Sequence, residues 1–154
     1  VMDSRKAKVQ SWYLDMSMIR KYWEGAKRAY HHTGPISMIY GVHEAMRIVF
    51  EEGLQNRFER HKQNHMKLKE GLESMGFEFL VASEFRLPML NAIKIPEGID
   101  DVKVRSRLLN EYDIEIGAGL GEFAGKVWRI GLMGESCTQN HINLLLSALN
   151  QILG

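Results

Sequence analysis

The 154-residue chain is poor in cysteine and proline and has no long apolar run. Its single thiol, Cys137, cannot close an internal disulfide, which suits a reducing compartment. We therefore expect an intracellular protein, cytoplasmic or organellar, although composition alone does not identify the compartment. No stretch of about 18 apolar residues occurs, so a transmembrane helix is excluded. The chain starts at Val1 in a polar run without a signal core, as expected for a piece of a longer protein.

The charges lack a dominant sign. Twenty Lys and Arg residues against nineteen Asp and Glu residues give a formal net charge of +1, and the two signs are interspersed along the chain. Such a pattern excludes a basic stripe for nucleic acid or for an anionic membrane surface. With 45% hydrophobic and 25% charged residues, the composition is that of one ordinary globular domain.

Hydrophobic periodicity predicts two long helices, over residues 36–52 and 54–74, with Gly53 between them. The later elements are expected as strands at 77–81, 90–95, 114–116 and 127–132, a helix from Asp100 or Asp101 to Tyr112, and a last helix capped by Thr138. This order predicts an α+β fold, in which two long helices precede a small, mostly antiparallel sheet covered by helices. The segment 12–23 is too apolar for a solvated helix, so we expect it to dock on another domain or subunit.

Two motifs imitate binding sites. The glycine-rich loop 117–125 has Glu122 where a dinucleotide fingerprint needs glycine, and a strand follows it instead of a helix, which favours a flexible inter-strand loop. His61 and His65 share one helix face but continue an apolar stripe, which favours packing over metal binding. A structural or solvated role is likewise the expectation for four further residues: Glu111, Asp113, Glu115 and Cys137. The sequence predicts no metal site and no catalytic residue.

Two features remain unusual. Residues 30–35 place Tyr30, two histidines and Thr33 directly before a helix, where hydroxyl and backbone N–H groups can bind phosphate; capping of that helix by Thr33 is the alternative interpretation. Arg129 lies inside an apolar strand, on the face opposite Trp128 and Ile130. A guanidinium there needs a carboxylate partner, from either the protein or a substrate.

The motifs at 30–33 (YHHT), 86–88 (RLP), 113–116 (DIEI), 119–121 (GLG) and 125–131 (GKVWRIG) occur in one order along nearly the whole chain. This series resembles the C-terminal portion of the class V, fold-type I pyridoxal-phosphate aminotransferases, in the serine–pyruvate/alanine–glyoxylate group. The resemblance implies that residues 1–35 form an N-terminal extension from the large-domain side and that residues 36–154 form the C-terminal small domain.

The resemblance also implies roles for three residues. Tyr30 and Thr33 would bind the phosphate of pyridoxal 5'-phosphate in the neighbouring subunit of a homodimer, and Arg129 would bind the carboxylate of the amino-acid or 2-oxo-acid substrate. The expected reaction transfers an amino group from alanine or serine to glyoxylate or pyruvate. The family's Schiff-base lysine precedes this region and Lys6 does not match it, so we expect the chain alone to be inactive. The alternative function is a stand-alone, non-catalytic α+β binding, regulatory or dimerisation module.

Overall fold

The computed structural model describes residues 2–27 and 29–154. It divides into two compact units, Val1–Ile48 and Val49–Gly154, which we describe separately. This division falls within a helix and does not test the domain boundary expected after residue 35, which stays a prediction. No helix in the described part of the chain is long and apolar enough to span a membrane.

The first unit contains α1 (Met16–Ile19), a 3-10 turn (Arg20–Tyr22) and most of α2 (Ile36–Glu52). Asp15 begins α1 by accepting a hydrogen bond from the backbone N–H of Ser17. Trp12 and Trp23 remain more than half exposed. The docking of the segment 12–23 on another domain or subunit therefore stays a prediction.

The two long helices have the predicted bounds. α2 ends at Glu52, and α3 (Leu54–Ser74) begins after Gly53, whose φ of 81° breaks the helix. The apolar stripe on α3 is buried only in its second half, at Leu68 and Leu72, whereas Leu54 and Phe58 are exposed. The first half of the stripe thus makes no contribution to the core of the second unit.

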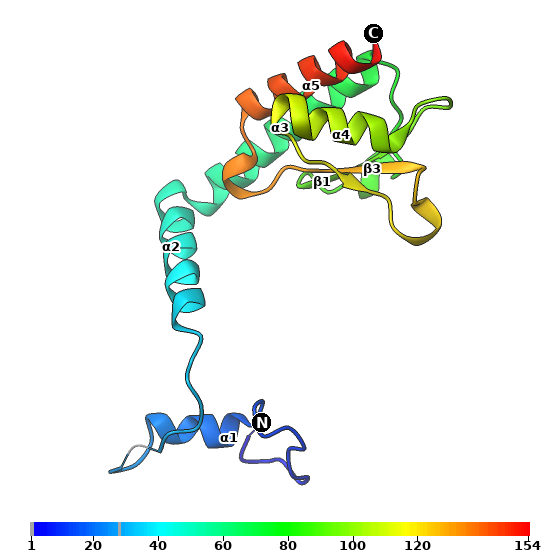
Figure 1. The fold of residues 1–154 in the computed structure, drawn as a ribbon. Helices are drawn as coiled ribbons and strands as arrows, with labels where there is room; N and C mark the ends of the chain where they lie inside the picture. The colour runs from blue at the N-terminus through cyan, green and yellow to red at the C-terminus, as the bar shows by residue number, and fades with distance from the viewer. Residues whose placement is uncertain (1, 28) are drawn as a thin grey trace. The chain divides into compact units, whose positions relative to one another are not determined.

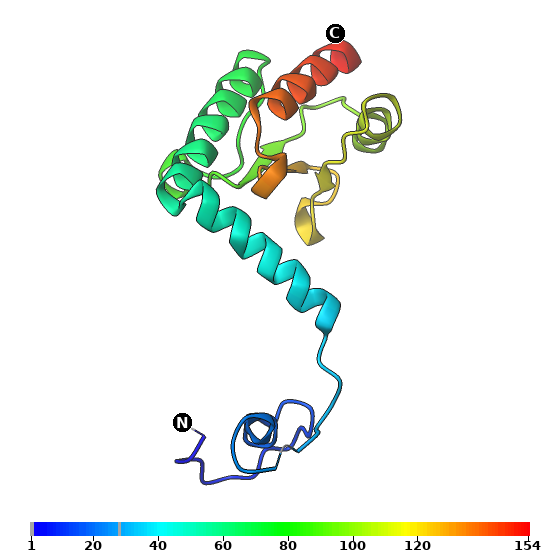
Figure 2. The ribbon, with the colours of Figure 1, turned by 90° about the vertical axis from the view of Figure 1, so that its left-hand side faces the viewer.

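The second unit is a small antiparallel sheet with helices on one side. β1 (Leu90–Lys94), β3 (Val127–Gly131) and β2 (Gly117–Ala118) lie in the order β1-β3-β2, both pairs antiparallel. α4 (Asp101–Tyr112) and α5 (Gln139–Leu153) follow β1 and β3 in the chain. Figures 1 and 2 show α3, α4 and α5 on the same side of the sheet. The predicted α+β fold is confirmed.

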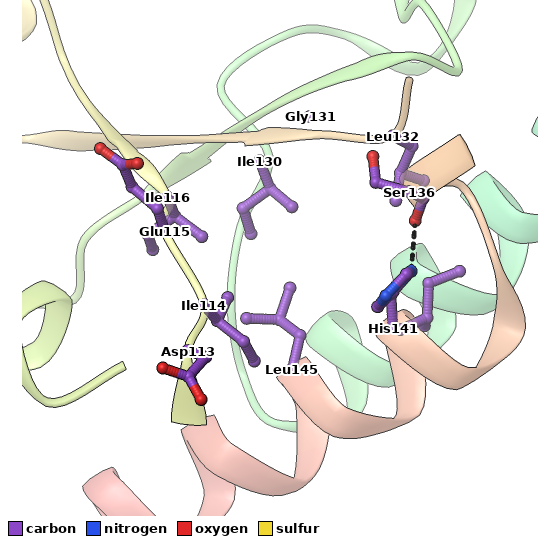
Figure 3. Close-up of a pocket in the computed structure, with 11 residues that line it drawn as sticks. Asp113, Ile114, Glu115, Ile116, Ile130, Gly131, Leu132, Ser136, His141 and Leu145 are labelled. Atoms are coloured by element: carbon purple, nitrogen blue, oxygen red, sulfur yellow. Dashed lines mark hydrogen bonds between the residues drawn. The ribbon is translucent and has the colours of Figure 1, made fainter. Parts of the chain in front are cut away.

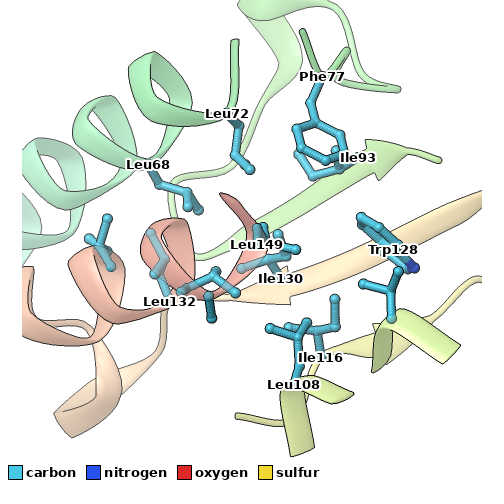
Figure 4. Packing of buried hydrophobic residues seen from close by; sticks show 14 of the residues in the cluster. Leu68, Leu72, Phe77, Ile93, Leu108, Ile116, Trp128, Ile130, Leu132 and Leu149 are labelled. Atoms are coloured by element: carbon cyan, nitrogen blue, oxygen red, sulfur yellow. The ribbon is translucent and has the colours of Figure 1, made fainter. Parts of the chain in front are cut away.

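One hydrophobic core joins this sheet to its helices (Figure 4). Trp128 and Ile130 of β3 point into it, as strand alternation predicts, and meet Leu72 and Leu149 from α3 and α5. The indole Nε1–H of Trp128 donates to Asp101 at 2.8 Å. This bond ties the start of α4 to the middle of the sheet.

Two predicted strands are wrong. Residues 77–81 form a single bridge, between Phe79 and Ile93, because the chain leaves β1 after Leu80 and enters a 3-10 turn at Ser83–Phe85. Residues 114–116 are not a strand either, since the backbone N–H of Ile114 still bonds the end of α4. The strand there is shorter and begins only at Gly117.

Candidate functional site

Arg129 occupies the middle strand of the sheet. Its neighbours across the ladder are Ala92 on β1 and Gly117 on β2. The Nε–H group donates to the carbonyl oxygen of Ala118 at 2.7 Å, which holds the half-buried guanidinium against β2. A Cβ atom at Gly117 would lie 3.2 Å from Nη2 of Arg129, tighter than most such contacts. Glycine at 117 therefore leaves room for the guanidinium.

Arg129 differs from the other arginines of the second unit, because its guanidinium has no acidic partner among the described residues. Five other arginines of the second unit form ion pairs: Arg57 and Arg60 with Glu52, Arg86 with Glu73, Arg105 with Asp101, and Arg107 with Glu111. Within residues 2–27 and 29–154, no carboxylate pairs with Arg129. Of the two partners expected from the sequence, a protein side chain is therefore absent from this part of the chain, and the terminal N–H groups remain available to a carboxylate ligand.

The glycine-rich loop between β2 and β3 packs tightly beside Arg129. Gly119 is buried, and a Cβ atom there would lie 2.0 Å from the carbonyl oxygen of Phe123. After the 3-10 turn Gly121–Phe123 the chain enters β3 and not a helix. The loop thus lacks the helix N-terminus that a dinucleotide site uses, as the sequence predicts.

The hydroxyl groups of Tyr30 and Thr33 lie together in the first unit. Their oxygen atoms are 2.5 Å apart, and the side chain of Tyr30 is largely exposed. Thr33 stands before Pro35 and the start of α2 at Ile36. The bond to Tyr30 gives the Thr33 hydroxyl a partner other than the backbone of α2, which weakens the capping interpretation. Tyr30 and Thr33 belong to one unit and Arg129 to the other, so their relative placement is not described.

Two further residues, Tyr22 and Glu52, make hydrogen bonds that were not predicted from the sequence. Tyr22 bonds the backbone of the loop that carries Tyr30. Glu52 accepts hydrogen bonds from Arg60 and Arg57, which lower the pKa of its carboxyl group to about 2. Arg60 also donates to the carbonyl oxygens of Gly134 and Cys137. The spacing of Glu52, Arg57 and Arg60 in the sequence could have indicated their ion pairs. The carbonyl partners of Arg60 lie far away in the sequence, so no local pattern indicates them.

The histidines that resemble a metal-binding pair in the sequence, and the single cysteine, make contacts within the fold. His65 is buried, and its Nδ1 lies 2.7 Å from the side-chain oxygen of Asn91, whereas Nδ1 of His61 lies near the carbonyl of Arg57. Among the described residues, no group of three His, Cys, Asp or Glu side chains could hold a metal ion. Cys137 is buried beside Asn64. These positions support the packing interpretation.

A cavity of about 260 Å³ lies between the segment 113–116, the end of β3 and the start of α5. Ile130, Leu145 and other apolar side chains form its walls, and Asp113 and Glu115 stand at its side, as Figure 3 shows. His141 bonds the carbonyl oxygen of Ser136 at 3.0 Å. Arg129 does not line this cavity, because its side chain leaves β3 on the other face. The cavity and the guanidinium are therefore separate features.

Several known proteins are similar to the chain over almost its whole length. The (S)-ureidoglycine–glyoxylate transaminase of Bacillus subtilis is 39% identical over 145 residues, which cover 94% of this chain and 35% of that protein. The alanine–glyoxylate aminotransferase of Drosophila melanogaster is 39% identical over 152 residues, which cover 97% of this chain and 39% of that protein. No protein-family model matches the chain.

A solved structure agrees with these sequences. The crystal structure of alanine–glyoxylate aminotransferase from Nostoc sp. matches 99% of this chain and 40% of its own, with a TM-score of 0.89 and 48% identity. The chain thus spans about two fifths of the length of the proteins that it matches. On this combined evidence of sequence and fold, the chain belongs to the alanine–glyoxylate aminotransferase group of class V, fold type I, and corresponds to a C-terminal portion of these proteins.

Proposed function

We propose that the chain is the C-terminal domain of a pyridoxal-phosphate-dependent aminotransferase that moves an amino group from alanine or serine to glyoxylate or pyruvate. The observation that carries the proposal is the guanidinium of Arg129, which is fixed through Nε to the carbonyl of Ala118 and has no carboxylate partner in the described residues. All three similar proteins reported above are named for glyoxylate. Glyoxylate and pyruvate are 2-oxo acids, whose shared carboxylate is the group that a guanidinium binds.

Arg129 would act by orienting the substrate. Two parallel N–H···O contacts fix both the place and the plane of a carboxylate, which a lysine ammonium cannot do. Because Nε is already bonded to Ala118, the fork that faces the substrate consists of the terminal nitrogens. The strand backbone and Gly117 hold that fork in place. The arginine thereby aligns the reacting carbon without taking part in proton transfer.

The phosphate of the cofactor would be held by Tyr30 and Thr33 of the neighbouring subunit in a homodimer. The two hydroxyl groups fit this task because they lie 2.5 Å apart, and the largely exposed Tyr30 can donate to an anionic oxygen. The bound cofactor supplies the electron sink for chemistry at the substrate α-carbon. Tyr30 and Thr33 only anchor it.

The chain alone is proposed to be inactive, because no lysine in it matches the one that holds the cofactor covalently in the family. Lys6 is exposed and lies in a polar segment. Phosphate anchoring and carboxylate recognition are the tasks of this domain, and the covalent cofactor site belongs to the remaining part of the full-length enzyme.

The substitution Arg129→Lys in the full-length enzyme tests the proposal. Losing one charge-assisted hydrogen bond costs about 1.5 to 3 kcal/mol, or roughly 10- to 150-fold in kcat/KM for glyoxylate. We expect KM to rise and kcat to fall together, since a misoriented substrate reacts slowly even when bound.

The matched control is Arg107→Lys, a conservative change at an exposed pair with Glu111. It is expected to leave kcat/KM within about twofold, because exposed ion pairs contribute little. An Arg129→Lys enzyme with the kcat/KM of the control would rule out the carboxylate role. A full-length protein that neither binds pyridoxal phosphate nor transfers amino groups would point instead to the non-catalytic module.

A further inference from the structure

The hydroxyl group of Tyr22 bonds three backbone groups of the loop that carries Tyr30 and Thr33. It accepts hydrogen bonds from the N–H groups of His31 at 2.9 Å and His32 at 2.8 Å, and it donates to the carbonyl oxygen of His32 at 2.5 Å. A phenol oxygen has one O–H donor and two lone pairs. In Tyr22 the donor and both lone pairs bond the backbone of two consecutive residues, His31 and His32.

Aromatic side chains hold the same two residues from outside. The ring of Trp12 lies 3.9 Å from that of His31, and the ring of Tyr13 lies 4.6 Å from that of His32, measured between centroids. His31 is buried, with 7% of its surface exposed. These contacts hold the middle of the loop, and Tyr30 and Thr33 lie on either side of it.

Those two ends carry the hydroxyl groups of the proposed phosphate site. Tyr30 precedes the clamped histidines and Thr33 follows them, so the backbone of His31 and His32 sets the distance between the two side chains. The ring of Tyr22 also meets that of Tyr30 edge-on, at 6.2 Å between centroids. One side chain thus restrains both the loop backbone and the tyrosine ring at its start.

Loss of this restraint has a defined physical cost. Without the Tyr22 hydroxyl, two N–H groups and one carbonyl would bond water, and the loop would gain backbone conformations. Ordering a residue costs conformational entropy. A loop that must be ordered by its ligand binds that ligand more weakly than a preformed one.

We infer that Tyr22 is a positioning residue for phosphate binding: it holds the Tyr30–Thr33 loop in the conformation that brings the two hydroxyl groups together. Tyr22 itself does not touch the phosphate. The inference rests on the proposed function, in which Tyr30 and Thr33 bind the phosphate of the cofactor. It adds a residue that neither the sequence motifs nor the resemblance had assigned.

The test compares pyridoxal phosphate with pyridoxal, which lacks the phosphate, in the full-length enzyme. Tyr22→Phe keeps the ring and removes only the hydroxyl. We expect the affinity for pyridoxal phosphate, measured by equilibrium titration, to fall about 10-fold, the effect of roughly one hydrogen bond. The affinity for pyridoxal should change less than about twofold, because its binding uses no phosphate contact.

Tyr13→Phe is the matched control. Its ring packs on the neighbouring His32, and within residues 2–27 and 29–154 its hydroxyl has no hydrogen-bond partner. We expect it to leave both affinities unchanged. If Tyr22→Phe lowers the affinities for pyridoxal phosphate and pyridoxal equally, the effect is a general structural one and the inference is overturned. An unchanged affinity for both ligands would also overturn it.

A second measurement separates the inference from the proposed function. In a Tyr30→Phe, Thr33→Ala background the added Tyr22→Phe change should have less than about twofold effect on cofactor affinity, because coupled residues are not additive. An undiminished tenfold effect would overturn the inference. If the background variant itself keeps wild-type cofactor affinity, the proposed phosphate role of Tyr30 and Thr33 fails. If only Tyr22→Phe is without effect, the positioning role alone fails.

Discussion

Replacing Gly119 by alanine should disturb the support of Arg129 while leaving every polar contact chemically intact. A Cβ atom on Gly119 would lie 2.0 Å from the carbonyl oxygen and 2.6 Å from the carbonyl carbon of Phe123, and 3.1 Å from the carbonyl oxygen of Val127. All three atoms are backbone, so no side chain can rotate away. The loop itself must move, by about 1 Å, to restore an ordinary contact distance.

The size of the effect follows from the overlap. Overpacking by one methyl group in a tightly packed site costs about 1 to 3 kcal/mol, and a clash with fixed backbone belongs at the upper end. For a chain of this length, about 3 kcal/mol lowers Tm by roughly 6 to 12 °C. Thermal unfolding followed by circular dichroism measures this shift directly.

The control is Gly131→Ala, at the end of β3. A Cβ atom there meets only the end of the flexible Met133 side chain, at 3.5 Å, an ordinary contact. Its Tm should therefore stay close to that of the parent chain. In the full-length enzyme, Gly119→Ala should also raise KM for the 2-oxo acid, because Ala118, which accepts the bond from Arg129, is the adjoining residue. A Gly119→Ala chain with the same Tm as the parent chain would refute the packing argument.

Three further outcomes are expected. Leu72→Ala removes a fully buried side chain and should lower the free energy of unfolding by about 2 to 5 kcal/mol, measured by urea titration; a loss below about 1 kcal/mol would contradict the burial. The pKa of Glu52, lowered from 4.5 to about 2 chiefly by Arg60, means that this carboxylate stabilises the fold fully above pH 4.5 and progressively less as the pH falls toward 2; Glu52→Gln should melt below the parent at neutral pH, with a gap that closes over this range. Borohydride treatment of the 154-residue chain with pyridoxal phosphate should label no single lysine stoichiometrically by mass spectrometry, and selective labelling of Lys6 would contradict the proposed inactivity.

Local signals in the sequence predicted the helices well. Gly53 breaks the backbone between α2 and α3, Asp100 and Thr138 cap α4 and α5 through their side chains, and Pro96 follows the end of β1. Each of these signals acts within a few residues, so no tertiary information is needed. Strand alternation likewise predicted which face of β3 carries Arg129.

The errors arose where tertiary pairing decides the structure. Residues 77–81 have the composition of a strand, but their pairing with β1 is limited to a bridge at Phe79. The segment after Asp113 stays bonded to α4 because this residue adopts a left-handed conformation, with a φ of 55°. Similarly, the contacts of Tyr22 join positions nine and ten residues apart through the fold of a loop, which periodicity cannot predict.

The alternation along β3 separates two effects of substitution in this strand. Trp128 and Ile130 are buried among the helices, whereas Arg129, between them, faces the other side of the sheet. On the neighbouring strand, Asn91 and Ile93 are buried and Ala92, beside Arg129, is only partly so. Stability and the proposed carboxylate recognition therefore depend on different, interleaved positions of one strand. A substitution of Trp128 or Ile130 changes the core, whereas a substitution of Arg129 changes the proposed site.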